Sequence, residues 1–124
     1  MIDFQNGFFR KLKLDKDPRV SDVENILVAG ESVIASYSAT RDYVIFTNKR
    51  VISVNVQGLT GKKKDFTSIP YANIIAFSIE TAGTVDADCE LDLLLSTIGT
   101  VRFEFTNTTD IYRIGKAISQ YVLK

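Results

Sequence analysis

Apolar and polar residues alternate with a period of two through most of the region from Glu31 to Asn107. This period is typical of β-strands that bury one face and leave the other in solvent. The alternation is clearest at Leu91, Leu93, Leu95, Val101, Phe103 and Phe105. We therefore expect a mainly β domain in which these six side chains meet across a hairpin, joined by residues 97–99.

Turn residues divide this region into seven expected strands. They are placed at about residues 32–38, 42–47, 50–57, 64–69 and 74–81, with the last two in the hairpin described above. Antiparallel pairing follows from the short connections between them, because such connections join neighbouring strands of opposite direction. The sequence thus predicts seven antiparallel strands.

The hairpin that turns through Asn48 and Lys49 has apolar residues on both faces. A two-residue turn there places one set of apolar side chains on a common face: Tyr43, Ile45, Ile52 and Val54. Val44, Phe46 and Val51 then line up on the opposite, outward face. Bulky apolar side chains on the outside of a sheet need a cover, so these three are candidates for an interface between subunits, unless the N-terminal aromatic residues cover them.

Both ends of the chain have helical spacing. Phe4, Phe8 and Leu12 recur four residues apart, and Asp17 followed by Pro18 is typical of a helix N-terminus. Residues 1–29 are therefore expected to form a helical arm that packs on the domain of residues 30–124. A second stripe predicts a C-terminal helix that begins after a cap at Thr108 or Thr109 and closes the sheet: Ile111, Ile114, Ile118 and Val122.

Length and charge limit the classes of function. The 124 residues, 45% of them apolar, suit one domain with one core. Fifteen basic and fifteen acidic residues leave no net charge, so a general attraction to nucleic acid is absent and no nucleic-acid partner is expected. The first 14 residues lack a secretory apolar region, and no apolar run approaches the roughly 20 residues that span a bilayer. We expect a cytoplasmic protein.

The residues that usually carry catalysis are scarce. The chain has no histidine, which removes the commonest general base and metal ligand. Its one cysteine, Cys89, follows Asp86 and Asp88, and nearby negative charge disfavours the reactive thiolate. Gly58 and Gly61 flank a loop that no strand-to-helix step follows, unlike a nucleotide-binding loop. We expect no enzymatic activity, no metal and no cofactor.

Two charged clusters remain as candidate sites. The acidic cluster is Asp86, Asp88, Glu90 and Asp92, whose alternate positions place all four carboxylates on one face of a strand. Alternate side chains of a strand lie about 7 Å apart, which is too far for four to hold one cation. The basic cluster is Lys62, Lys63 and Lys64, at the base of a loop. Each cluster is alternatively an ordinary solvated surface.

Two motifs resemble the bacterial pleckstrin-homology-like (PH-like) domain family. They are the "TNKR" turn, at residues 47–50 between two apolar strands, and "IPYANI", at residues 69–74. The resemblance covers the chain from about residue 30 and implies the PH fold, a barrel of seven strands in two nearly orthogonal sheets capped by the last helix. It also implies a non-enzymatic binding or scaffolding module, and ring-like homo-oligomers. Basic residues for phosphoinositide recognition are missing from the first hairpin loop except for Arg41.

The leading functional hypothesis is self-association into a closed, ring-like homo-oligomer that presents a surface to another protein. A basic loop and an acidic strand on one molecule suit a head-to-tail contact, in which Lys62–Lys64 of one subunit meet Asp86–Asp92 of the next. The alternative is a peripheral membrane module that binds anionic lipid through the Lys62–Lys64 loop and the arm. The lipid candidates are Phe8, Phe9, Arg10, Lys11 and Arg41.

Overall fold

Eight strands and one C-terminal helix make up the structure, a computed structural model that describes residues 1–4, 8–84 and 87–123. In chain order the elements are β1 (Phe8–Leu14), β2 (Val33–Ser38), β3 (Tyr43–Thr47), β4 (Arg50–Gln57), β5 (Lys63–Pro70), the 3₁₀ turn η1 (Tyr71–Asn73), β6 (Ile74–Glu80), β7 (Cys89–Leu95), β8 (Gly99–Phe105) and α1 (Ile111–Val122). The expected mainly β class with a C-terminal helix is confirmed.

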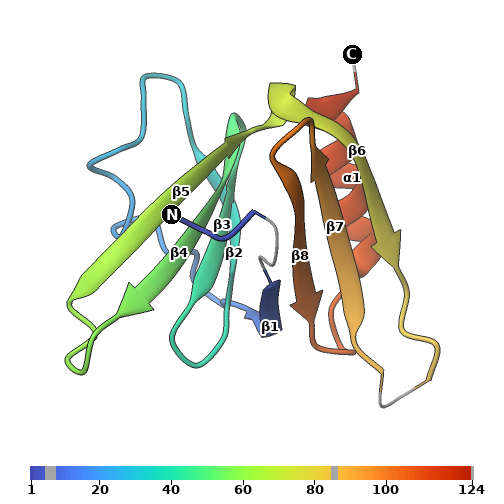
Figure 1. The fold of residues 1–124 in the computed structure, drawn as a ribbon, viewed down its shortest axis with the longest axis horizontal. Helices are drawn as coiled ribbons and strands as arrows, with labels where there is room; N and C mark the ends of the chain where they lie inside the picture. The colour runs from blue at the N-terminus through green and yellow to red at the C-terminus, as the bar shows by residue number, and fades with distance from the viewer. Residues whose placement is uncertain (5–7, 85–86, 124) are drawn as a thin grey trace.

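All eight strands belong to one sheet, in the order β5-β4-β3-β2-β1-β8-β7-β6. Figure 1 shows β2 to β5 and β6 to β8 as two halves of this sheet, with α1 against the second half. Strand β1 joins the halves, since it pairs antiparallel with β2 and parallel with β8. The prediction of seven antiparallel strands in two sheets is therefore wrong in detail, because a further strand links the two halves.

That further strand replaces the predicted N-terminal helical arm. Phe9 and Leu12 of β1 are buried in the main core, and the register of β1 with β8 shifts between them. Lys11 lies at this irregularity with φ +59°, a conformation uncommon for residues other than glycine. The bulge turns side chains three positions apart to the same side. Residues 21–26 form turns rather than a helix.

The β3–β4 hairpin has the predicted pairing but not the predicted burial. Ile45 pairs with Ile52, as the two-residue turn requires. The expectation that Val44, Phe46 and Val51 face outward is wrong, because 0%, 3% and 0% of these residues is exposed and all three lie in the main core. Their side chains are therefore not accessible to another subunit.

The other face of this hairpin carries a second, smaller core. Tyr43, Ile45, Ile52 and Val54 pack there against Val23 and the half-buried Leu27. The long connection between β1 and β2 thus covers the outer face of the β3–β4 hairpin. Burial, together with nearby Asp22, raises the pKa of Tyr43 to about 12.

The "TNKR" turn holds this covering connection in place. Thr47 Oγ1 accepts the backbone N–H groups of Lys49 and Arg50 and donates to Glu31 Oε2 at 2.7 Å. Asn48 donates to the carbonyl of Gly30 at 3.0 Å. The guanidinium of Arg50 pairs with Glu31. This motif therefore has a structural role, because its side chains form hydrogen bonds both within the turn and with the neighbouring loop.

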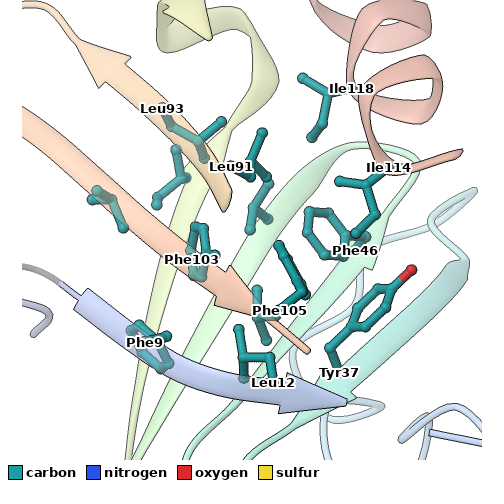
Figure 2. Packing of buried hydrophobic residues seen from close by; sticks show 14 of the residues in the cluster. Phe9, Leu12, Tyr37, Phe46, Leu91, Leu93, Phe103, Phe105, Ile114 and Ile118 are labelled. Atoms are coloured by element: carbon teal, nitrogen blue, oxygen red, sulfur yellow. The ribbon is translucent and has the colours of Figure 1, made fainter. Parts of the chain in front are cut away.

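The last hairpin and the helix complete the main core. Leu91 pairs with Phe103 and Leu93 with Val101 across a three-residue connection, so the expected faces are confirmed and the register differs from the expected one by two residues. Helix α1 is capped by Asp110, whose carboxylate accepts the N–H of Arg113, rather than by Thr108 or Thr109. Its stripe faces the cluster shown in Figure 2, where Ile114 and Ile118 approach the aromatic and leucine side chains of the sheet.

Candidate functional site

The basic cluster lies at the tip of the β4–β5 hairpin. Lys62, Lys63 and Lys64 are all exposed, and none of them forms an ion pair among the residues that the structure describes. Arg41, from the neighbouring β2–β3 loop, donates from Nη2 to the carbonyl of Gly58 in the same tip. We refer to these four cations as the basic tip. The structure therefore brings Arg41 to the same tip as the three lysines, although they are far apart in the sequence.

The turn of this tip depends on glycine and presents one apolar side chain. Gly58 and Gly61 have φ values of +80° and +68°, which are costly for residues with a Cβ. Leu59 between them is fully exposed. An exposed leucine beside four cations is a small amphipathic projection, which was not predicted from the sequence.

The acidic cluster belongs to a larger surface on the outer face of β6, β7 and β8. Glu80 pairs with Glu90, and Glu90 in turn pairs with Glu104, so three glutamates lie directly opposite one another. In the next row outward-facing Asp92 pairs with Arg102. We call Glu80, Asp88, Glu90, Asp92 and Glu104 the acidic face. No described element covers it, because α1 packs on the opposite side of these strands (Figure 1).

Two cations neutralise part of the acidic face. Arg102 contacts Asp92 at 2.8 Å and Glu90 at 3.5 Å. Lys11 Nζ lies 2.6 Å from Asp88 Oδ2 and ties β1 to the start of β7. Five carboxylates against two cations leave the face negative. Asp86, the remaining carboxylate of the predicted acidic cluster, lies outside the described residues.

The close approach of charged groups on the acidic face shifts the pKa values of several of them. Burial and the hydrogen bond with Asp88 raise the pKa of Glu104 above its ordinary value. The hydrogen bond from Lys11 lowers the pKa of Asp88, and the contact with Asp92 raises the pKa of Arg102. Like charges directly opposite in a sheet destabilise it, so this face is maintained at a cost to stability.

The N-terminal lipid candidates are only partly accessible. Phe9 is buried, with its ring centroid 5.3 Å from that of Phe103. Phe8 is half-buried under the guanidinium of Arg10, which lies 4.7 Å from the ring centroid. Lys11 is engaged with Asp88. As part of β1 these residues form a strand, so the amphipathic helix expected for the arm is not formed.

Two hollows were not predicted from the sequence. One, of about 330 Å³, lies at the corner between β5 and β6 and includes the exposed Ile75 and Ile98 together with Phe4. The other, of about 400 Å³, lies between β1 and the start of α1 and includes Lys13 and Arg113. Their linings come from segments up to 100 residues apart. Periodicity within a segment gives no signal for such a site.

Other kinds of site have little support in the described part of the chain. Among those residues no group of three or more histidine, cysteine or acidic side chains could hold a metal ion. Cys89 is buried, with its sulfur 3.7 Å from the carbonyl of Thr109. No helix in the described ranges is both long and apolar enough to cross a membrane.

Comparison of the sequence with known families and proteins gives consistent matches. The model described as "Bacterial PH domain" matches residues 4–122. "Uncharacterized protein YjqA" of Bacillus subtilis (strain 168) is 43% identical over 100 residues, which is 79% of this chain and 80% of that protein. "Uncharacterized protein YozO" of the same organism is 33% identical over 100 residues, or 81% and 86% of the two chains.

Solved structures agree with these matches. A pleckstrin-homology protein of the DUF1696 family from Shewanella loihica PV-4 is 35% identical and has a TM-score of 0.81, covering 92% of this chain and 99% of that one. A pleckstrin homology domain from Shewanella amazonensis SB2B is 36% identical and has a TM-score of 0.68, covering 89% and 94%. The fold and the sequence therefore point to the same group of proteins.

Proposed function

Because this chain belongs to the bacterial PH domain family, we propose that it is a non-enzymatic binding module that assembles head-to-tail with copies of itself and presents the assembly to another protein. The contact would join the basic tip of one subunit to the acidic face of the next. Each subunit would then contribute one surface of each sign.

The row formed by Glu80, Glu90 and Glu104 is the observation that carries this proposal. Like charges directly opposite in a sheet cost stability, and the nearby Arg102 is already engaged by Asp92 and Glu90. A partner that supplies cations to this row would relieve the repulsion. Charge complementarity of this kind also sets the orientation of a contact and speeds association.

The position of the two surfaces favours a heterologous contact. The basic tip lies beside β5, one edge of the sheet, whereas the acidic face includes β6, the other edge. A self-complementary contact would need both signs within one patch. Two different patches instead join head-to-tail, and such contacts close into a ring when the rotation between subunits permits closure.

Mass in solution tests self-association directly. Light scattering coupled to gel filtration would be run on the full chain at about 50 mM and about 500 mM NaCl, where surface charges are screened over roughly 14 and 4 Å respectively. We expect an oligomer of defined mass at low salt that dissociates at high salt. A monomer at both salt concentrations, at tens of micromolar protein, would rule out the proposal.

Charge-reversal variants identify the surfaces. The triple change K62E/K63E/K64E is expected to give monomers at low salt, and E80K/E90K to do the same. The matched control K16E/K49E/K116E reverses three other exposed lysines and should leave the mass unchanged. Equal loss of assembly in the control would show that net charge, rather than this contact, controls the mass.

A second candidate function, binding to an anionic membrane, is favoured by Leu59. This side chain is fully exposed at the basic tip, and each cation near an anionic surface contributes about 1 kcal/mol. Sedimentation with phosphatidylserine vesicles would test it, with Leu59→Asp as the variant that keeps the cations of the tip. Binding that Leu59→Asp does not weaken, or no binding at all, would eliminate apolar insertion at this tip.

A further inference from the structure

The hollow between β1, β2 and the start of α1 has the composition of an anion site. Its volume is about 400 Å³, within the range of small-molecule sites. Seven polar side chains line it: Lys13, Tyr37, Thr106, Thr108, Thr109, Asp110 and Arg113. Six of them can donate hydrogen bonds, two carry positive charge, and Asp110 carries one negative charge. This hollow is distinct from the basic tip and the acidic face.

Tyr37 is the feature that core packing does not explain. Only 3% of this residue is exposed, and its ring makes edge contacts with Phe105 and Phe46 at 5.0 Å and 5.9 Å between centroids. Its hydroxyl, however, has no hydrogen-bond partner in the described ranges. Figure 2 shows the hydroxyl pointing away from Leu12 and Phe105, out of the cluster. Phenylalanine would fill the same core space, so packing does not require the hydroxyl, which is not among the fully buried unpartnered atoms of the described residues and belongs to a side chain that lines the hollow.

Tyr37 shares the hollow with charged groups. Asp110 and Arg113, at the start of α1, line the same hollow. The carboxylate of Asp110 accepts the backbone N–H of Arg113 at 3.2 Å. The side chains of Arg113 and Lys13 form no ion pair within the described segments, so both cations are available and the hollow is positive overall.

Threonine hydroxyls complete the lining on the loop before α1. Thr106 Oγ1 lies 3.2 Å from Thr108 Oγ1 and 3.4 Å from Thr109 Oγ1. The backbone of Thr106 is fixed to β1, since its N–H donates to the carbonyl of Leu12 at 3.0 Å. Three hydroxyls are therefore held close together on a segment that is anchored to the strand carrying Lys13.

We propose that this hollow binds a phosphate monoester group. Lys13 and Arg113 would supply the positive charge, and the hydroxyls of Tyr37 and the threonines would donate to the remaining oxygens. A tetrahedral phosphate with three terminal oxygens can accept hydrogen bonds from all these sides, whereas a planar carboxylate has only two oxygens. The volume beyond the phosphate itself, next to the exposed Leu14, leaves room for a small organic portion.

A ligand titration followed by NMR tests the site and distinguishes the source of the phosphate. Uniformly ¹⁵N-labelled full chain would be titrated with inorganic phosphate and with glycerol 3-phosphate, and in a parallel arm the chain would be sedimented with vesicles containing phosphatidic acid. We expect saturable shifts at the amides of Thr106, Thr108 and Thr109. Binding of glycerol 3-phosphate would show that a soluble phosphate ester is sufficient to occupy the site. Vesicle binding alone, if lost in the variants below, identifies a lipid headgroup.

Two sets of variants separate this site from general electrostatics. Tyr37→Phe keeps the ring in the core and should weaken glycerol 3-phosphate about 5- to 10-fold, with the unfolding midpoint unchanged or higher. K13Q/R113Q should weaken it at least about 50-fold. The control K49Q/K62Q removes two charges elsewhere and should leave the dissociation constant within about 2-fold. Shifts confined to the basic tip, Tyr37→Phe binding as tightly as the parent, or no saturable binding of any probe would overturn the proposal.

Discussion

Arg50 donates two hydrogen bonds to the buried carboxylate of Glu31, with Nε 2.9 Å from Oε2 and Nη2 2.9 Å from Oε1. The same Nη2 also donates to the carbonyl of Ile26. These contacts join the "TNKR" turn to the connection that covers the second core. They explain why a motif that resembles a family signature has a structural rather than a chemical role.

The Arg50–Glu31 pair should contribute strongly to stability. Arg50→Met leaves a buried carboxylate without its partner, so we expect a loss of about 3 kcal/mol in the free energy of unfolding, measured by urea denaturation. Arg102→Met is the matched control, because the ion pairs of Arg102 are half-exposed and should contribute less than about 1 kcal/mol. Equal effects of the two substitutions would contradict the assigned role of Arg50.

Glu104→Gln should stabilise the protein at neutral pH. The pKa of Glu104 is raised in the folded state, by burial and by its hydrogen bond with Asp88. The folded state therefore binds more protons than the unfolded state, and the stability of the parent falls as pH rises from about 4.3 through the raised pKa. We expect a gain of about 0.5 kcal/mol at pH 7 that disappears below about pH 4.

Urea denaturation of the parent and Glu104→Gln at several pH values measures this difference. Glu24→Gln, at an exposed position, serves as the control for removing one negative charge. A gain for Glu104→Gln that is independent of pH, or that is matched by the control, would mean that carboxylate repulsion on the acidic face is not its cause.

The contact of α1 with β6 should be intolerant of larger side chains at Gly115. A Cβ at this position would lie 3.0 Å from Ile79 Cδ1 and 3.3 Å from its Cγ2. Gly115→Val is therefore expected to cost about 2 kcal/mol through overpacking. Ile79→Ala in the same chain should recover part of this loss, because it removes the clashing atoms. Gly83→Ala, where nothing lies within 4 Å, should be nearly neutral and serves as the control.

Cys89 should react slowly with thiol reagents in the native state. The residue is 2% exposed and lies beneath the loop that leads into α1. Labelling therefore requires opening of that region. We expect the rate with a disulfide reagent to be at least about 100-fold lower in buffer than in denaturant. Similar rates in both conditions would show that the α1 end of the core opens readily.

The faces of the strands could be predicted from local patterns alone. Alternation from Leu91 to Phe105 determines which side chains point together, because successive side chains of any strand point to opposite sides. The two-residue turn at Asn48 and Lys49 determined the pairing of Ile45 with Ile52 for the same local reason. The apolar stripe of the last helix was predictable from its 3.6-residue period.

Only the tertiary structure decided what covers each face. Val44 and Ile45 lie on opposite faces and are both fully buried, so their hydrophobicity did not distinguish the main core from the second core. Phe8 and Leu12 are four residues apart, a spacing compatible with a helix and with a strand. Strand β1 forms because it can pair with β2 and β8, whose paired residues lie 23–25 and 93–94 positions further along the chain. Pairing and site formation between such distant segments depend on the order of the strands in the sheet, which no local pattern encodes.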